Sequence, residues 1–294
     1  MMPVNVLERI SSFTPLGIRF WDSTLDKEVT DGLIVGAWPE AQVPPRPVFA
    51  RRSGSGIYHV SGLPGLRDFE TADDPATVPT PPRRFVVSVM DREERFLPVA
   101  FAVDLPLAYR GLFLGPNSGI DPPLPGFELY PAPNRRRPTW LAAVRGELIS
   151  AATEAPAPHA VVEVTAPDAT IWSGIADAEG RFAVFLPWPA VPSVPQSTPP
   201  TAPAMTATLD DLFWQIDFQV RWDPAGLPAL PGLLLPDVAE IMSQPAADVW
   251  ANPQEDGGTP APSLPITLQF GVEAVARTTN SQSRLRIGAA PPSP

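Results

Sequence analysis

The chain has 294 residues, of which 42 are proline and none is cysteine, and its formal net charge is −11. Proline interrupts helices and central strands, so this composition excludes a largely helical fold, while the absence of cysteine excludes disulfides and thiolate metal sites. Residues 1–137 carry 15 basic and 16 acidic side chains, and the rest of the chain carries 6 and 16, so the second half is strongly acidic. Because nucleic-acid binding needs lysine and arginine to neutralise phosphates, we do not expect a nucleic-acid partner.

Short runs in which apolar and polar residues alternate, each bounded by glycine or proline, recur along the whole chain and predict β-strands. The predicted strands, in chain order, are 17–23, 31–39, 56–65, 84–91, 95–106, 140–150, 159–167, 180–189, 213–222, 264–276 and 283–288. We therefore predict an all-β chain with at most short helices.

The order of these runs repeats between the two halves of the chain. The runs that end at Pro39 and Pro167 are offset by 128 residues, and the runs that contain Gly56 and Gly180 by 124. The next two runs, which start near Phe85 and Phe213, are again offset by 128 residues. Near-equal offsets indicate a duplicated β domain. We predict two tandem antiparallel β-sandwich domains, residues 1–133 and 140–294, joined by a linker at 134–139.

The predicted linker contains three arginines, Arg135, Arg136 and Arg137. A charged stretch rich in proline and asparagine is typical of a solvated linker, and the alternative interpretation is a docking patch for a partner.

Two long proline-rich loops are predicted in the second domain, at 190–208 and 223–262. The second includes one expected short helix that starts near Pro236, and it is too apolar for a solvated linker. We expect it to cover its own domain or to contact another chain. The candidate partner-contact residues, besides the three arginines, are Leu230, Leu233, Leu234, Leu235, Trp188 and Trp250.

The acidic stretch from Asp177 to Gly180 precedes an alternating apolar run and allows two interpretations. A calcium loop would need more carboxylates at regular spacing, and only Glu179 is near. An aspartate at the start of a turn and a glycine in the left-handed position describe a β-turn. We interpret Asp177 and Gly180 as structural turn residues and expect no metal site.

No catalytic constellation is evident. His59 and Ser61 are two residues apart on one expected strand, which is not the geometry of a nucleophile and its base, and His159 has no indicated partner. The acidic pairs 73–74, 93–94 and 210–211 are adjacent residues, which point to opposite faces of a strand or into water. We expect no enzyme activity, no cofactor and no small-molecule substrate.

Residues 145–187 resemble the carboxypeptidase regulatory-like domain, a small transthyretin-like β-sandwich. The matching positions are Gly146, Val162, Val164, Asp177, Gly180, Phe182 and Pro187. Ile175 and Ala176 depart from the pattern, because a threonine often precedes the aspartate there. The resemblance implies a transthyretin-like or immunoglobulin-like sandwich without catalytic residues, and such folds serve many functions.

The whole chain is similar to accessory structural proteins of phage tail-like contractile injection systems. The similarity lies in "VTDGLIVGAWP", "SGIYHVSGLPGLRDFE" and "RRFVVSVMDREERFLPVAFAVDLP". It implies a subunit of the baseplate or spike region, assembled in the cytoplasm with other protein subunits. The first residues lack the charge and apolar pattern of a secretory signal, and no apolar stretch is long enough to span a membrane.

Two other functions stay open. A carbohydrate-binding or adhesive module is one alternative, because eight tryptophans offer platforms for sugar stacking. A hydrolase with a misinterpreted β domain is the remote alternative.

Overall fold

The computed structural model describes residues 13–74, 81–107, 112–115, 125–190 and 209–289. The chain divides into two compact units, which are described separately below. Unit 1 comprises Met1–Glu93, Pro98–Leu129 and Pro228–Ala239, and unit 2 comprises Glu94–Leu97, Tyr130–Leu227 and Glu240–Pro294. Each unit therefore includes a short segment that is remote in sequence from the rest of it.

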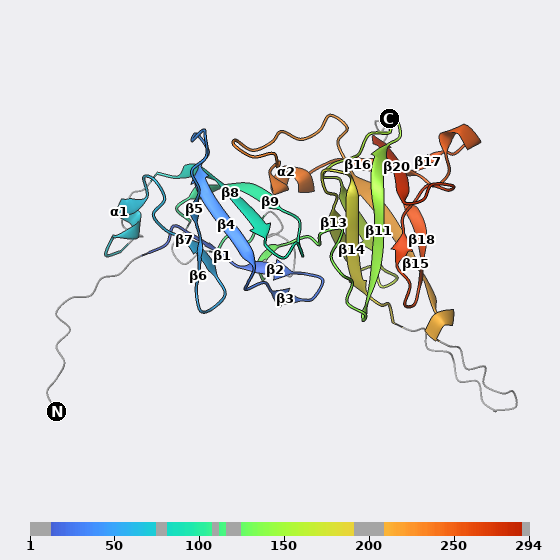
Figure 1. The fold of residues 1–294 in the computed structure, drawn as a ribbon, viewed down its shortest axis with the longest axis horizontal. Coiled ribbons are helices and arrows are strands. Elements are labelled where there is room, and N and C mark those ends of the chain that lie inside the picture. Colours follow the sequence, from blue (N-terminus) through green and yellow to red (C-terminus); the bar gives the residue numbers. More distant parts are fainter. Residues whose placement is uncertain (1–12, 75–80, 108–111, 116–124, 191–208, 290–294) are drawn as a thin grey trace, which may run out of the picture. The chain divides into compact units, whose positions relative to one another are not determined.

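Unit 1 contains ten short strands and one helix, α1 (Arg67–Glu70), among its described residues (Figure 1). The strands are β1 (Leu16–Ile18), β2 (Phe20–Asp22), β3 (Lys27–Glu28), β4 (Leu33–Pro39), β5 (Val48–Phe49), β6 (Arg51–Arg52), β7 (Tyr58–Val60), β8 (Arg83–Asp91), β9 (Val99–Leu105) and β10 (Phe127–Glu128). They form an antiparallel sheet in the order β5-β4-β8-β9 and two small sheets, β1-β7-β6 and β10-β2-β3.

Aromatic rings fill the core of unit 1. The ring of Phe20 meets Tyr58 and Phe127 edge to face at centroid distances of 5.3 and 5.8 Å, and Phe101 stacks on Phe113 at 4.4 Å. Such pairs add to the free energy gained from burying their area, so they help to hold the small sheets against β9.

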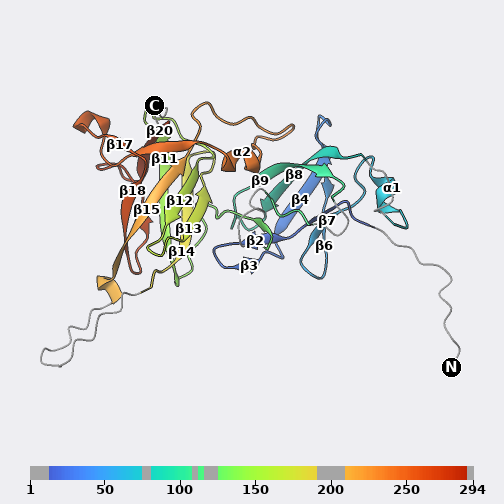
Figure 2. The same cartoon turned by 180° about the vertical axis from the view of Figure 1, so that it is seen from behind.

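Unit 2 is one connected network of strands, shown from two sides in Figures 1 and 2. The strands are β11 (Leu141–Ser150), β12 (Val161–Thr165), β13 (Ile171–Ile175), β14 (Arg181–Pro187), β15 (Phe213–Arg221), β16 (Ala246–Trp250), β17 (Pro260–Ala261), β18 (Leu264–Gln269), β19 (Ala274–Val275) and β20 (Arg284–Ala289). The main path runs β13-β12-β15-β16-β20-β11-β14, with β18 paired to β15 and β19 to β11. Two 3-10 turns, Leu209–Asp211 and Gln254–Asp256, also belong to unit 2, and helix α2 (Val238–Met242) begins in unit 1 and ends in unit 2.

The all-β prediction is confirmed, and the only α-helices of the described chain have four and five residues. The predicted loop 223–262 is more structured than expected, because it contains α2, β16 and β17. Strand β16 lacks the alternation that signals a strand, since Ala247 to Trp250 are all buried. The predicted loop 190–208 lies almost wholly outside the described residues.

Both faces of β14 are buried. Phe182, Val184 and Leu186 belong to the core of unit 2, and Ala183 and Phe185 on the opposite side are no more than 1% exposed. Arg135 and Arg145 lie over the Phe185 ring, 5.8 and 5.2 Å from its centroid. The chain around residue 135 therefore covers this strand from outside.

The same order of strand pairing recurs in both units. In unit 1 β4 pairs with its neighbour β5 and with β8, and β8 pairs with β9; in unit 2 β12 pairs with β13 and β15, and β15 pairs with β18. Likewise β1 pairs with β7, and β11 with β14. All these pairs are antiparallel. The main difference is the connection to the last strand, residues 92–98 in one unit and 222–263 in the other.

Candidate interaction surfaces

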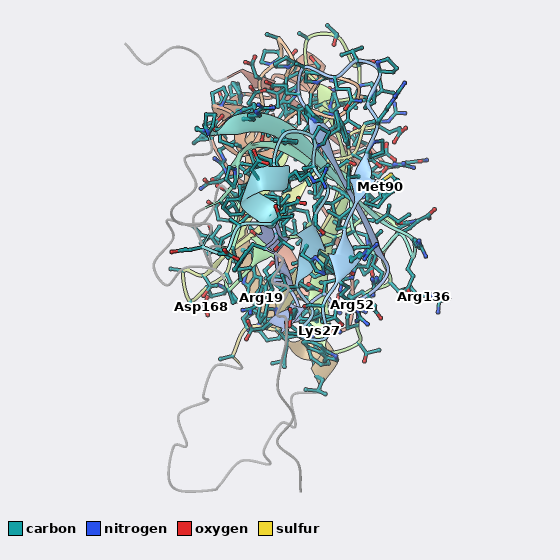
Figure 3. The ribbon with its side chains drawn as sticks, turned by 90° about the vertical axis from the view of Figure 1, so that its left-hand side faces the viewer. Arg19, Lys27, Arg52, Met90, Arg136 and Asp168 are labelled. Atoms are coloured by element: carbon teal, nitrogen blue, oxygen red, sulfur yellow. The ribbon has the colours of Figure 1, made fainter. Side chains whose placement is uncertain are left out.

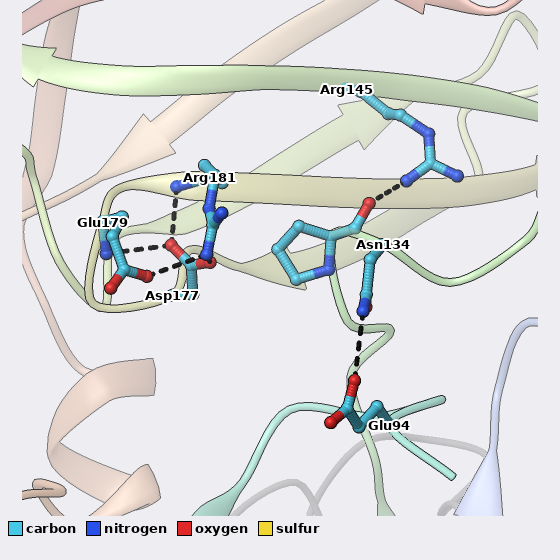
Figure 4. A network of polar contacts seen from close by, with 7 residues as sticks. Glu94, Asn134, Arg145, Asp177, Glu179 and Arg181 are labelled. Atoms are coloured by element: carbon cyan, nitrogen blue, oxygen red, sulfur yellow. Dashed lines mark hydrogen bonds and ion pairs between the residues drawn. The ribbon is translucent and has the colours of Figure 1, made fainter.

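Asp177 uses its carboxylate to build its own turn. One oxygen, Oδ1, accepts hydrogen bonds from the backbone N–H groups of Glu179 and Arg181, both at 2.9 Å. The other, Oδ2, accepts from Arg181 Nε at 2.9 Å, and the guanidinium also pairs with Glu179 (Figure 4). The hydrogen bond to Asp177 raises the pKa of Arg181 above its ordinary value. This arrangement is a closed Asx-type turn, and the groups that a metal would need are already engaged.

Gly180 is required by the same turn. Its φ of +78° is in the left-handed region, and a Cβ at this position would overlap the carbonyl oxygen of Leu148. That carbonyl accepts a hydrogen bond from Ala157 N at 2.9 Å, while Leu148 N donates to the carbonyl of Gly180 at 2.8 Å. The turn is therefore fixed against the first strand of unit 2 with no room for a side chain.

The three consecutive arginines all belong to unit 2 but have different environments. Arg137 donates to the carbonyls of Leu141 and Gly271 at 2.8 and 2.9 Å and lies 6.0 Å from the Trp188 ring centroid. Arg135 lies 4.7 Å over the ring of Phe96. Only Arg136 is exposed. The stretch 134–139 is thus packed on unit 2 rather than free in solvent, and of the three only Arg136 is available to a partner.

Arg145, on β11, holds residues 133–135 against the sheet through hydrogen bonds. It donates to the carbonyl oxygen of Pro133 (Figure 4). It also donates to the carbonyl oxygen of Arg135, and its Nε is 3.2 Å from Glu273 Oε2. Asn134, in the same stretch, donates to Glu94 at 3.5 Å. Because guanidinium groups satisfy several carbonyls at once, one strand residue holds an otherwise irregular segment in place.

Exposed apolar side chains gather at one end of unit 2, which we call the apolar end. Its exposed members are Trp140, Leu209, Phe213 and Val272, at 59, 59, 55 and 50% exposure. They share one end because Leu141 pairs with Pro187 and Phe213 with Gln269, and because Phe270 N donates to the carbonyl of Leu212. In Figure 1 the 3-10 turn that begins at Leu209 marks this end below β15.

Trp188, between two prolines, lies over the core next to the apolar end. Its ring centroid is 5.8 Å from Trp214 and 5.0 Å from Phe270, and the side chain is half-buried. Trp188 thus mainly closes the core. The other predicted contact tryptophan, Trp250, is 8% exposed on β16 and is part of the interior of unit 2, which corrects its assignment as a surface residue.

The predicted leucine cluster forms a narrow loop in unit 1. Ala229 bridges to Pro236, and Leu230 N donates to the carbonyl of Leu235 at 2.8 Å. Leu234 at the tip is 93% exposed, whereas Leu230, Leu233 and Leu235 are partly buried. Of the four leucines, only Leu234 is therefore largely exposed.

Asp237 fixes the base of this loop. Its Oδ1 accepts a hydrogen bond from Ala239 N and so caps α2, which starts at Val238, two residues later than expected. Its Oδ2 accepts from Ala102 N on β9 at 2.9 Å. The buried carboxylate of Asp237 therefore accepts hydrogen bonds from both α2 and the edge strand β9.

The remaining candidate residues do not converge. His59 is half-buried on β7 of unit 1, and His159 is in unit 2, where burial lowers its pKa and the charge of Asp177 opposes that shift. Within the described ranges, no three histidine or acidic side chains are placed to hold a metal ion, and no helix there is long and apolar enough to cross a membrane.

Of the eight tryptophans that could stack on sugars, four are buried and three are half-buried. The buried ones are Trp38, Trp214, Trp222 and Trp250, and only Trp140 is largely exposed. A sugar platform usually needs a wide exposed aromatic face, so this distribution gives the carbohydrate-binding alternative one candidate residue.

Comparison with known proteins adds little. No protein-family model matches the chain, and no curated protein matches it. A solved structure described as "Crystal structure of tetra-tandem repeat in extending region of large adhesion protein" aligns with 89% of this chain and 67% of that chain, at 10% identity and a TM-score of 0.15. At that score the likeness carries no argument about fold or function.

Proposed function

We propose that this chain is a non-catalytic structural or adaptor subunit of a phage tail-like contractile injection particle, in its baseplate or spike region. The proposal also assigns each unit to the transthyretin-like or immunoglobulin-like sandwiches. It is supported by the recurrence of antiparallel pairing in the two units and by the sequence similarity to accessory particle proteins.

The observation that carries the proposal is a set of exposed apolar side chains in both units. The apolar end presents Trp140, Leu209, Phe213 and Val272, and the leucine loop presents Leu234. Contiguous exposed apolar side chains favour contacts with other proteins, and Trp is enriched among the residues that dominate binding energy. Subunits of a particle need such surfaces, whereas an isolated enzyme does not.

The partners in this proposal are other protein subunits. The acidic second half disfavours nucleic acid, and an interface that holds a subunit in a particle should bury more than about 1,000 Å². The apolar end is the surface proposed for such contact. We assign the assembly to the cytoplasm, with release as part of the particle.

The test is incorporation of the tagged chain into particles in its native host. Particles are purified by sedimentation, and the chain is quantified in the particle fraction and located by electron microscopy. We expect Trp140→Ser combined with Val272→Ser to reduce incorporation at least tenfold, while the matched surface change Arg277→Ser on the same unit leaves it unchanged. A wild-type chain that stays monomeric and absent from every particle fraction refutes the proposal.

A further inference from the structure

The sheet β5-β4-β8-β9 of unit 1 has an outer face, opposite the aromatic core, that is covered at one end and open at the other. Alternate residues of a strand point to the same face, so Ile34 and Trp38 share this face of β4. Trp38 pairs with Val86 on β8, and both side chains are buried. Ile34 is half-buried and pairs with Met90, which is 48% exposed. The open end of the face is therefore the end at Met90, which Figure 3 labels on the right-hand side of the view.

Phe49 extends this open end onto the neighbouring strand. It pairs with Gly36 and is 62% exposed. A Cβ at Gly36 would lie 3.6 Å from the Phe49 ring, so the ring is on the same face as Ile34, two residues away on β4. Diagonal neighbours on adjacent strands are about 7–8 Å apart, a distance that large side chains span. Phe49, Ile34 and Met90 thus form one exposed apolar surface, which we call the Phe49 patch.

The strands around the Phe49 patch offer no free edge to which a further strand could be added. Ala50 N donates to the carbonyl of Val35 on β4 at 2.8 Å, and the next residue, Arg51, pairs with His59 on β7. At the other side of the sheet, the carboxylate of Asp237 occupies the edge of β9. An occupant of the patch must therefore satisfy its own backbone hydrogen bonds, as an α-helix does.

Two arginines without an ion pair flank Phe49 in the sequence. Arg46 lies three residues before it and Arg51 two residues after it, and both are exposed. Within the described ranges, neither arginine forms an ion pair. The chain from Val43 to Tyr58 contains a third arginine, Arg52, and no acidic residue. The side of the patch at β5 is therefore positively charged and complements an acidic partner.

We propose that the Phe49 patch binds an amphipathic helix of a partner protein. Apolar side chains of that helix cover Phe49 and Met90, and its acidic side chains pair with Arg46 and Arg51. A two-fold contact between copies of this chain would bring the same arginines together, so a different, acidic protein fits the patch better. The inference rests on the proposed function in one respect, namely that the chain acts by binding other proteins.

The test measures binding of three labelled eighteen-residue peptides to the full-length protein by fluorescence anisotropy. The first is a designed amphipathic helix with leucine on one face and glutamate on the other, the second has lysine in place of glutamate, and the third has two central prolines added to the first. We expect the glutamate peptide to bind, with an affinity that falls as salt rises, and the other two to bind at least tenfold more weakly. Because the protein has a net charge of −11, non-specific attraction would favour the lysine peptide instead. Equal binding of the lysine peptide or of the proline peptide overturns the proposal.

Substitutions of the apolar side chains locate the site. Phe49→Ser combined with Met90→Ser should weaken binding of the glutamate peptide at least tenfold, because both residues are exposed on the patch. The matched control is Val275→Ser, at an exposed apolar residue of unit 2, which should leave binding unchanged. Circular dichroism checks that each variant is folded. Unchanged binding by the double variant, or an equal loss in the control, overturns the proposal.

Substitutions of the arginines test the charge and leave the apolar side chains in place. Arg46→Glu combined with Arg51→Glu should weaken binding of the glutamate peptide at least tenfold and should strengthen binding of the lysine peptide. The matched control is Arg136→Glu, at an exposed arginine of unit 2, which should change neither affinity. A double variant that binds the glutamate peptide as the wild type does overturns the proposal.

Further results separate this inference from the proposed function. If the glutamate peptide binds as expected but the chain enters no particle, the patch stands as a binding site and the particle assignment fails. If particles form normally with the Phe49→Ser, Met90→Ser chain, the particle assignment stands and the patch is not its contact. A concentration-dependent dimer of the chain alone that this double variant abolishes would show a second copy as occupant and overturn the assignment to a different protein.

Discussion

Two glycines lie in similar turns of unit 2, and substituting each by alanine compares a turn packed against a strand with an open one. Gly180 has φ of +78° and Gly226 of +76°, and each donates its N–H to the carbonyl of an aspartate three residues earlier. Both aspartates also accept a backbone N–H two residues later, so the turns match. They differ in surroundings, because a Cβ at Gly226 meets nothing within 4 Å and one at Gly180 overlaps the carbonyl of Leu148.

We expect Gly226→Ala to lower the free energy of unfolding of unit 2 by about 1 kcal/mol, the cost of a left-handed alanine. Gly180→Ala carries the same cost and also displaces the carbonyl of Leu148, which weakens two backbone hydrogen bonds worth about 1 kcal/mol each. The expected loss is therefore about 3 kcal/mol. For a unit of this size, that corresponds to a fall in Tm of about 6–12 °C, against about 2–4 °C for Gly226→Ala.

The assay is urea unfolding followed by tryptophan fluorescence, supported by a thermal scan. Trp21 and Trp38 are in unit 1 and the other tryptophans are in unit 2, so fluorescence reports mainly on the unit that carries both glycines. Equal losses for the two variants would show that the contact with Leu148 costs nothing and would refute the reasoning. A larger loss for Gly226→Ala would refute it more strongly.

Other expectations follow from the surroundings of individual side chains. Arg137→Ala removes two hydrogen bonds to carbonyls and should cost about 2–3 kcal/mol in urea unfolding, whereas Arg136→Ala should stay within about 0.5 kcal/mol. Trp188→Ala should lower Tm clearly because two aromatic rings pack on it, while Trp140→Ala should not. Because burial lowers the pKa of His159 in the folded state, its contribution to stability is present above about pH 6.5 and is lost as pH falls below that value. His159→Gln should therefore flatten the decline of Tm between pH 7 and pH 5, and an unchanged pH profile would contradict this expectation.

Most strands were predictable from the sequence whether or not they alternate, but β16 was missed. The run at 213–222 has the apolar periodicity of a half-buried strand and corresponds closely to β15, whereas the run at 84–91 corresponds to β8, which buries Phe85, Val86 and Val87 in succession. Strand β16 is buried along most of its length, so its short sequence shows no period. That one omission also explains the error at Trp250, which looked like a loop residue and is packed inside unit 2.

Side-chain partners could not be predicted where they come from distant segments. The run of three arginines reads as one charged patch, yet Arg135 and Arg137 contact unit 2 while Arg136 faces solvent. The distinction depends on Phe96 and Gly271, which are remote in sequence. The alternation of apolar and polar residues indicates a strand, but it does not show which distant residues will contact that segment.

The long connection between β15 and β18 includes a segment that belongs to unit 1. In unit 1 the connection between β8 and β9 spans residues 92–98, whereas the equivalent connection in unit 2 extends over 222–263. Part of that longer connection, Pro228–Ala239, belongs to unit 1, where Asp237 closes the edge of β9 and holds the leucine loop. A segment of the connection between β15 and β18 thus closes an edge of the unit 1 sheet. The same segment therefore has two features. Asp237 closes the edge of β9, and Leu234 remains exposed to solvent.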